Sequence, residues 1–210
     1  MNVVIFGPPG AGKGTQAQNI VKKFNLHQVS TGDLLRTEIK NKSEIGKEIE
    51  EIISKGDFAT DNIVNKLIKN VIFDPQKKNK LIFDGYPRSL SQAKNLDLLL
   101  KNSNQKIDFI FFLNVNKDTI IKRIEKRKVL EKRSDDDLNT IIKRYETYME
   151  TTKPVLDFYS KNPNFHEIDG SQEIDEIIAK IVVEISRFQI YEKFAKLFWI
   201  ENNFVFLKNY

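Results

Sequence analysis

A glycine-rich segment near the start of the chain constrains its fold more than any other feature. Residues 7–15 read Gly-Pro-Pro-Gly-Ala-Gly-Lys-Gly-Thr and directly follow the apolar run Val3-Val4-Ile5-Phe6. A helical pattern of apolar residues begins at Lys13 and continues to Phe24. A continuous apolar strand that passes through glycines into a helix is typical of a parallel sheet whose strands are covered by crossover helices.

The rest of the chain repeats this alternation of short apolar runs and longer helical patterns, which predicts a doubly wound parallel sheet. Besides residues 3–6, strands are expected at residues 28–30, 81–83, 109–115 and 165–168. Helices are expected at residues 13–24, 63–72, 91–100, 118–127, 135–159 and 174–187. The fold prediction is therefore one α/β domain with five parallel strands, helices on both faces of the sheet, and two insertions at residues 30–60 and 124–135.

The spacing Gly7-x-x-x-x-Gly12-Lys13 predicts a phosphate-binding loop, or P-loop. Glycines let backbone N–H groups turn toward phosphate oxygens, the helix N-terminus adds partial positive charge, and Lys13 adds a full charge. In the strict motif a hydroxyl residue follows the lysine, whereas here Gly14 follows and the hydroxyl belongs to Thr15. A glycine turn without a ligand is the alternative, but chance rarely places this motif at the first strand–helix junction. The predicted fold is thus of the P-loop NTPase type.

An acidic strand end accompanies the P-loop. Leu81-Ile82-Phe83-Asp84 is an apolar run that ends in a carboxylate, as in the Walker B segments that help to position Mg²⁺. Many strands end in aspartate, so the pattern is weak alone and gains weight from the P-loop. Together the two motifs predict that Thr15 and Asp84 hold Mg²⁺ through water.

Arginine is scarce in this lysine-rich chain. Only seven of its 34 basic side chains are arginines, so arginine is expected where its planar, bidentate fork matters, as it does on phosphate oxygens. Arg123 and Arg127 are four residues apart on a predicted helix and share a face. Ion pairing at the surface is the alternative for any single arginine. The seven are Arg36, Arg88, Arg123, Arg127, Arg133, Arg144 and Arg187.

Six ordered segments resemble the nucleoside monophosphate kinases and, among them, the adenylate kinases, over roughly residues 1–186. The Gly14-Thr15 ending of the P-loop is that family's own variant. The resemblance implies Mg²⁺-dependent, reversible, in-line transfer between ATP and AMP to give two ADP, without a nucleophilic side chain. The segments are residues 7–15, Ser30–Arg36, Gly56–Asp61, Asp84–Arg88 with Gln92, the arginines between residues 123 and 144, and Asp169–Gln172.

The resemblance also implies the role of each site residue. The expected catalytic cations are Lys13, Arg88, Arg123, Arg133 and Arg144. The expected ATP-binding residues are Gly10, Ala11, Gly12, Lys13, Gly14, Thr15, Arg127 and Gln172. The expected AMP-binding residues are Thr31, Arg36, Asp57, Phe58, Ala59, Gly85, Tyr86, Pro87, Arg88, Gln92, Arg133 and Arg144. Closure of both insertions over the nucleotides would exclude water.

Two positions carry the expected preference for AMP. Thr31 and Gln92 match the AMP-selective members, whereas pyrimidine-directed relatives tend to have a small residue and an asparagine there. A glutamine amide can pair with an adenine edge because it carries both a donor and an acceptor. A UMP/CMP kinase of the same family remains the alternative at this stage.

The domain prediction is a single kinase domain over residues 1–187. Its core comprises residues 1–29, 61–123 and 136–187, with an NMP-binding insertion at 30–60 and a lid at 124–135. Only five residues separate Arg127 from Arg133, which predicts a short lid loop. Because the chain has no cysteine, the four-cysteine zinc lid is excluded, and no structural metal is expected.

Composition narrows the partners. The net charge is +5, but lysines are spread along the chain among acidic residues, so nucleotides and not nucleic acid are the expected polyanions. No run approaches the ~18 apolar residues of a membrane span, and the start lacks the pattern of a signal peptide. We therefore expect a cytoplasmic monomer that binds ATP, AMP and ADP without a membrane or nucleic-acid partner.

A P-loop GTPase switch is a competing prediction from another class. Its guanine-binding pattern Asn-Lys-x-Asp nearly occurs at Asn116-Lys117-Asp118, but the aspartate comes one residue early. That hypothesis also gives no role to the segment Gly85-Tyr86-Pro87-Arg88. The aromatic extension at residues 188–210 lies beyond the resemblance. It could prolong the last helix and pack on the body, form a dimer contact, or touch a membrane surface.

Overall fold

The computed structural model describes residues 1–54, 59–131 and 138–207. Its five strands form one sheet in which every neighbouring pair is parallel. The sheet has the order β2-β3-β1-β4-β5, and each observed strand limit lies within one residue of the predicted one. The strands are β1 (Val3–Phe6), β2 (His27–Ser30), β3 (Leu81–Asp84), β4 (Phe109–Asn114) and β5 (Phe165–Asp169).

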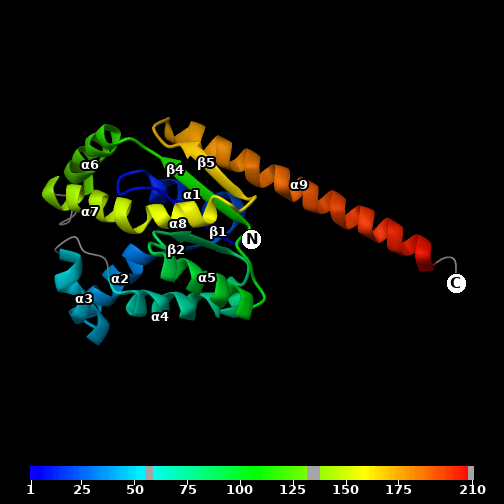
Figure 1. Cartoon of the computed structure of the whole chain (residues 1–210), viewed down its shortest axis with the longest axis horizontal. Coiled ribbons are helices and arrows are strands. Elements are labelled where there is room, and N and C mark those ends of the chain that lie inside the picture. Colours follow the sequence, from blue (N-terminus) through cyan, green and yellow to red (C-terminus); the bar gives the residue numbers. More distant parts are fainter. Residues whose placement is uncertain (55–58, 132–137, 208–210) are drawn as a thin grey trace.

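Helices cover both faces of the sheet, which confirms the doubly wound prediction (Figure 1). Successive side chains of a strand point to opposite faces, so Val4 and Phe6 join one apolar cluster while Val3 and Ile5 join the other. The helices are α1 (Lys13–Phe24), α2 (Thr31–Lys40), α3 (Glu44–Ser54), α4 (Asp61–Ile72), α5 (Leu90–Asn102), α6 (Lys117–Glu131), α7 (Leu138–Thr151), α8 (Lys153–Tyr159) and α9 (Ile174–Leu207), with a short 3₁₀ turn at Pro75–Lys77.

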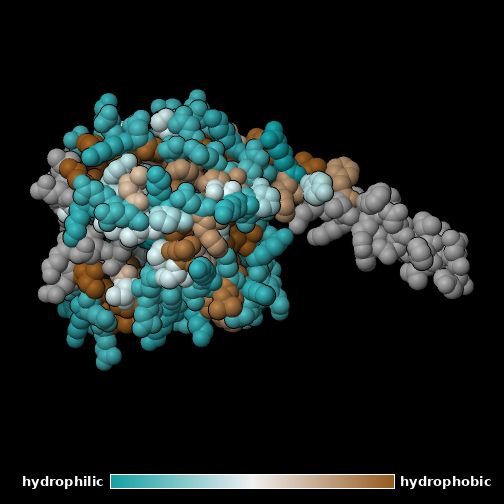
Figure 2. Space-filling view, viewed as in Figure 1, coloured by the Kyte–Doolittle hydropathy of each residue, from teal (hydrophilic) through white to brown (hydrophobic). Residues whose placement is uncertain are grey.

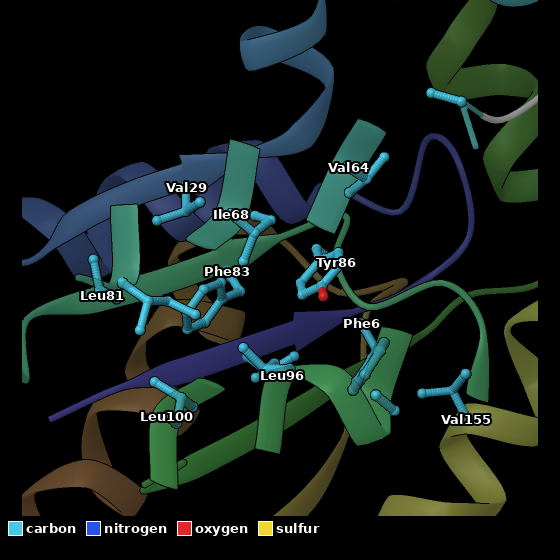
Figure 3. Packing of buried hydrophobic residues seen from close by; sticks show 14 of the residues in the cluster. Phe6, Val29, Val64, Ile68, Leu81, Phe83, Tyr86, Leu96, Leu100 and Val155 are labelled. Atoms are coloured by element: carbon cyan, nitrogen blue, oxygen red, sulfur yellow. The ribbon is translucent and has the colours of Figure 1, made fainter. Parts of the chain in front are cut away.

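The first apolar cluster joins α4, α5 and α8 to the sheet. Figure 3 shows Phe6, Phe83 and Leu96 pointing toward one another from two strands and a helix, and all three are buried. Burial of a side chain of this size contributes about 1.5–3 kcal/mol of transfer free energy. The second cluster lies on the other face and is closed by α1, α6 and α9. Two packed layers thus fix the carboxyl ends of the strands, where the loops meet.

Helices α2 and α3 lie within the predicted insertion at residues 30–60. They pack closely, since a Cβ added at Gly46 of α3 would overlap the carbonyl of Glu38 on α2. Helix α2 begins at a genuine cap, because Ser30 Oγ accepts a hydrogen bond from the N–H of Asp33. The pair therefore leaves the sheet directly at the end of β2.

The predicted helix over residues 135–159 is interrupted, and residues 135–137 lie outside the described part of the chain. Helix α7 ends at Thr151 and α8 begins at Lys153, with Pro154 in its first turn. Proline has no N–H to donate to the preceding turn, so a helix usually breaks before it. The break matters for the site, because Thr152 Oγ1 donates a hydrogen bond to the carbonyl of Arg88 at 3.1 Å.

Helix α9 continues twenty residues beyond its predicted end at Arg187. Its first part packs on the body through the buried Ile181 and Ile185, and the Phe188 ring meets Phe109 edge to face at 5.1 Å between centroids. Beyond that point Figure 1 shows α9 running away from the body, and Figure 2 shows apolar side chains where it leaves. Tyr191 and Phe194 are 73% and 66% exposed. The extension therefore prolongs the last helix, and its described side chains Tyr191 and Phe194 do not pack on the body.

Among the described helices, none is long and apolar enough to cross a lipid bilayer.

Candidate active site

The P-loop folds as the sequence predicts. Two of its glycines, Gly10 and Gly12, have φ angles of +82° and +89°, in the left-handed region that favours glycine. A Cβ at Gly10 would also lie 2.8 Å from the Ile124 side chain of α6. Gly12 precedes the first turn of α1 and its carbonyl accepts the Gln16 N–H at 3.0 Å. The loop thus presents backbone N–H groups and a helix N-terminus to the same space.

Lys13 reaches back across this loop. Its Nζ donates to the carbonyls of Gly7 and Pro8 at 2.7 and 3.0 Å. Burial, together with the nearby cations Arg88 and Arg144, lowers the pKa of Lys13 to about 8, and the carboxylate of Asp84 partly opposes this shift. The ammonium is therefore held at the centre of the loop and is poorly solvated. A bound phosphate would supply the negative charge that it lacks.

Asp84 ends β3 beside the P-loop, where its backbone is in register with Ile5 and Ser30 on the two neighbouring strands. The Gln28 amide donates to Asp84 Oδ2 at 3.1 Å. A Cβ added at Gly14 would lie only 3.6 Å from the same oxygen, so the start of α1 closely approaches the carboxylate. Mg²⁺ in nucleotide sites is usually held by one or two carboxylates, phosphate oxygens and water. The donor set of Asp84, the neighbouring Thr15 hydroxyl and a triphosphate fits this chemistry.

A cavity of about 710 Å³ extends along the P-loop and gathers most of the predicted site. Within the described part of the chain, five of the seven arginines line it, and they come from three helices and one loop that are far apart in sequence. Arg133 lies outside the described residues, as do Asp57 and Phe58. Arg187, which lies outside the segments that resemble the family, pairs with Glu184 and has a 72% exposed side chain. The predicted site residues on the cavity wall are Gly10, Ala11, Gly12, Lys13, Gly14, Thr15, Arg36, Asp84, Gly85, Pro87, Arg88, Arg123, Arg127, Arg144 and Gln172.

Arg88 is a partly buried arginine on the cavity wall. Its Nε donates to the Gly85 carbonyl at 2.8 Å, which folds the side chain back over its own loop. Burial and then the positive charge of Arg144 lower its pKa to about 10, against the opposing carboxylate of Asp84. Both arginines line the larger cavity, where an anion such as phosphate would offset the repulsion between their positive charges.

The remaining arginines are placed differently. Arg36 forms an ion pair with Asp33 one turn earlier on α2, and its guanidinium lies over Gly32. Arg123 donates from Nη1 to the Gly170 carbonyl at 2.7 Å, and its Nη2 lies 3.3 Å from the Gln172 carbonyl. Arg123 therefore ties α6 to the loop after β5, directly beside the P-loop.

A smaller cavity adjoins these arginines and is lined by Thr31, Ala59, Val64 and Gln92 among others. Thr31 Oγ1 donates to the Gly85 carbonyl at 2.9 Å, so the start of α2 is joined to the loop after β3. Tyr86 differs from the other residues predicted to bind AMP, because its ring lies in the apolar cluster and its hydroxyl donates to Asn65 Oδ1 at 2.7 Å. Its side chain belongs to the core, which leaves the backbone of that loop to face the cavity.

Tyr148 is a cavity residue that the sequence analysis did not identify. Burial raises the pKa of its phenol, and among the described residues its hydroxyl has no hydrogen-bond partner. It lies four residues after Arg144 on α7, so the two share a helix face, and this spacing could have pointed to it. Thr152 also lines the cavity and was not predicted, because its place depends on the break before Pro154.

Comparison with known proteins agrees with this geometry. The model of the family described as adenylate kinase matches residues 5–164. Three curated relatives are each named adenylate kinase. The protein of Pelagibacter ubique is 49% identical over 86% of this chain and 97% of its own length. That of Azobacteroides pseudotrichonymphae is 43% identical over 88% and 97%, and that of Thermosipho africanus is 33% identical over 89% and 100%. This chain therefore belongs to the adenylate kinase family.

Proposed function

We propose that this protein catalyses the reversible, Mg²⁺-dependent reaction ATP + AMP = 2 ADP with the residues described above. The observation that carries the proposal is the convergence of the P-loop, Lys13 and five arginines on one cavity that adjoins a smaller recess lined by Thr31 and Gln92. A cavity with so many cations and a single strand-end carboxylate suits two polyanionic substrates. No competing function accounts for the arginines outside the P-loop.

The P-loop would bind the ATP phosphates. Backbone N–H groups between Gly10 and Thr15 and the N-terminus of α1 face the phosphate oxygens, and Lys13 contributes charge at the transferred group. Asp84 and Thr15 would hold Mg²⁺ through water, and the ion would neutralise charge on the phosphates. The buried, poorly solvated ammonium of Lys13 supports this placement.

The arginine pair Arg88 and Arg144 would stabilise the phosphoryl group in flight. Phosphoryl transfer requires little covalent chemistry from the protein, so positioning and electrostatic stabilisation dominate. Preorganised cations act strongly in a site that excludes water. We place Arg36 on the AMP phosphate and Arg127 on the ATP side, with Arg133 joining the cage. Arg123 would orient the loop around Gln172, which we place against the adenine of ATP.

The acceptor is proposed to be AMP. Thr31, Ala59 and Gln92 line the smaller cavity together, and we add Asp57 and Phe58 to this set from the family resemblance. An amide that offers both a donor and an acceptor suits adenine. The UMP/CMP alternative has no observation in its favour. The cytoplasmic location, the monomeric state and the lack of nucleic-acid or membrane partners stay predictions.

A coupled assay with ATP and AMP, UMP, CMP or GMP tests the proposal. We expect turnover with AMP to exceed that with each other acceptor by at least about tenfold in kcat/KM, because a recess that hydrogen-bonds one base leaves its polar groups unpaired with another. Addition of excess EDTA should abolish the reaction and excess Mg²⁺ should restore it. Equal turnover of AMP and UMP would contradict the assignment of the acceptor site.

A further inference from the structure

Asp61 contacts Gln92, which lines the smaller cavity where we place the acceptor base, called the acceptor recess. Asp61 is the first residue of α4, and its carboxylate faces the start of α5. Oδ1 accepts a hydrogen bond from Gln92 Nε2 at 2.6 Å, and Oδ2 accepts from Ser89 Oγ at 2.9 Å and from Ser91 Oγ. One carboxylate therefore holds three side chains of a neighbouring helix start.

These contacts fix the orientation of the Gln92 amide. Its other end, Oε1, accepts the backbone N–H of Arg88 at 2.8 Å. A carboxylate can only accept and a backbone N–H can only donate, so only one of the two flipped amide orientations satisfies both partners. Gln92 is also 4% exposed, which makes a wrongly paired amide costly. Asp61 and the Arg88 backbone thus decide which end of the amide carries the N–H groups.

The same contacts leave part of the hydrogen-bonding capacity of the Gln92 amide unused. A primary amide has two N–H donors and two acceptor lone pairs. Asp61 uses one donor and Arg88 uses one lone pair, so one donor and one acceptor remain on a side chain that lines the recess with Thr31 and Ala59. Adenine presents an exocyclic amine that donates beside a ring nitrogen that accepts, which is the complement of this remainder.

We propose that Asp61 is a positioning residue that sets the base specificity of the acceptor site by holding the Gln92 amide in its adenine-reading orientation. This inference rests on the proposed function of the recess. Without the carboxylate only the Arg88 N–H would restrain the amide, and the flipped orientation would become accessible. The exchanged ends would suit a base whose exocyclic amine is replaced by a carbonyl. Inosine monophosphate carries such a base. The preference for AMP over inosine monophosphate therefore reports whether Asp61 holds the Gln92 amide in its adenine-reading orientation.

A purely structural role for these residues makes different predictions. Ser89-x-x-Gln92 has the spacing of a capping box, in which the glutamine closes on the N–H of the cap residue itself. Here Ser89 Oγ does accept the Gln92 N–H at 3.2 Å, but the amide oxygen accepts from Arg88, the residue before the cap. Asp61 also places negative charge at the start of α4, where it stabilises the helix. Loss of these structural roles would lower the free energy of unfolding without changing the preference for AMP over other monophosphates.

Two substitutions of Asp61 separate charge from orientation. Asp61→Asn removes the charge but keeps an oxygen that can accept from Gln92, while its amide can donate to the serine hydroxyls. Asp61→Glu keeps the charge at the helix start but displaces the carboxylate by one methylene. Asp61→Ala removes both. Ser91→Ala serves as the matched control, because it deletes one bond to Asp61 without touching Gln92.

The measured quantity is the ratio of kcat/KM for AMP to that for inosine monophosphate, alongside KM for ATP. We expect Asp61→Ala and Asp61→Glu to lower this ratio by about tenfold, as loss of a hydrogen bond to a charged group predicts. Asp61→Asn and Ser91→Ala should keep it within about threefold, and KM for ATP should not change. In a Gln92→Ala background, Asp61→Ala should have no further effect on the ratio.

The proposal is overturned if Asp61→Ala keeps the wild-type ratio, if Asp61→Glu keeps it while Asp61→Asn loses it, or if the effects of Asp61→Ala and Gln92→Ala add. Equilibrium dialysis of AMP and inosine monophosphate gives the same ratio as dissociation constants and does not need turnover. A wild-type protein that binds AMP selectively but transfers no phosphoryl group would overturn the proposed function and leave the role of Asp61 tested by binding. Thermal unfolding of each variant monitors the structural role separately.

Discussion

In the proposed site, the two sides of the cavity would hold their ligands with different parts of the chain. On the P-loop side, where we place ATP, most of the proposed binding groups are backbone atoms fixed by a strand, two glycines in the left-handed region and a helix, and the side chains of Lys13 and Arg127 join them. On the acceptor side they are side chains, each held by a specific hydrogen bond: Thr31 and Arg88 donate to the Gly85 carbonyl, and Gln92 donates to the Asp61 carboxylate. Backbone binding recognises phosphates in general, whereas oriented side chains can distinguish one base from another.

The largest expected effect comes from removing an acceptor-side cation. Arg88→Ala should lower kcat by about 10²–10³-fold, the range found when one preorganised transition-state donor is lost. The fold should persist, because the main packing clusters do not include this side chain. Steady-state kinetics with ATP and AMP measure the change. Arg187→Ala is the control and should be indistinguishable from wild type, since that side chain is exposed on α9. Near-normal turnover of Arg88→Ala would refute the proposed cage.

The two sides should also differ in pH dependence. The pKa of Lys13 is lowered from its ordinary value of 10.5 to about 8, so free enzyme loses this ammonium as pH rises through about 8. The pKa of Arg88 is lowered only to about 10, so the acceptor-side charge persists. Bound phosphates favour the charged lysine, so we expect ATP binding to take up a proton and to weaken about tenfold per pH unit above 8.

Calorimetric titrations in buffers of different ionisation enthalpy measure this proton uptake. AMP binding is the internal control, because its affinity should stay nearly constant between pH 8 and about 9.5, below the pKa of Arg88. A parallel loss of ATP and AMP affinity over that range would show that Lys13 does not set the dependence. ATP binding without proton uptake near pH 8 would show that its ammonium is already fully charged in the free protein.

The sequence predicted the P-loop side almost completely and the acceptor side only in outline. The strand, glycines and helix of residues 3–24 are local features, and each predicted limit matched the structure. The acceptor side depends on contacts between distant residues: Asp61 with Gln92, and Thr152 with Arg88. Neither contact follows from spacing or propensity. The place of Thr152 also requires the helix break before Pro154, which the helical apolar pattern conceals.

Thr152→Val tests how far the acceptor side depends on such remote support. The substitution keeps the shape of the side chain but removes the hydroxyl that donates to the Arg88 carbonyl at 3.1 Å. A neutral hydrogen bond contributes about 1 kcal/mol, so we expect kcat/KM for AMP to fall about fivefold while KM for ATP stays unchanged. Thr147→Val is the matched control, because its hydroxyl donates to the Lys143 carbonyl within α7 and, among the described residues, forms no hydrogen bond with the Thr152 hydroxyl. Equal losses in both variants would point to a general effect on that helix.

The smallest effect is expected from the projecting part of α9. Ile190 is 57% exposed, and Tyr191 and Phe194 are more exposed still, so a chain that ends at Gln189 should keep its kcat and its free energy of unfolding within about 0.5 kcal/mol. Ile181→Ala in the packed part of the same helix should instead cost about 2–5 kcal/mol, because that side chain is fully buried. Chemical denaturation measures both, and light scattering of full-length and shortened protein compares their masses. A marked loss of stability on shortening would mean that the extension packs against the body in solution, and the contrast between the two parts of α9 would not hold.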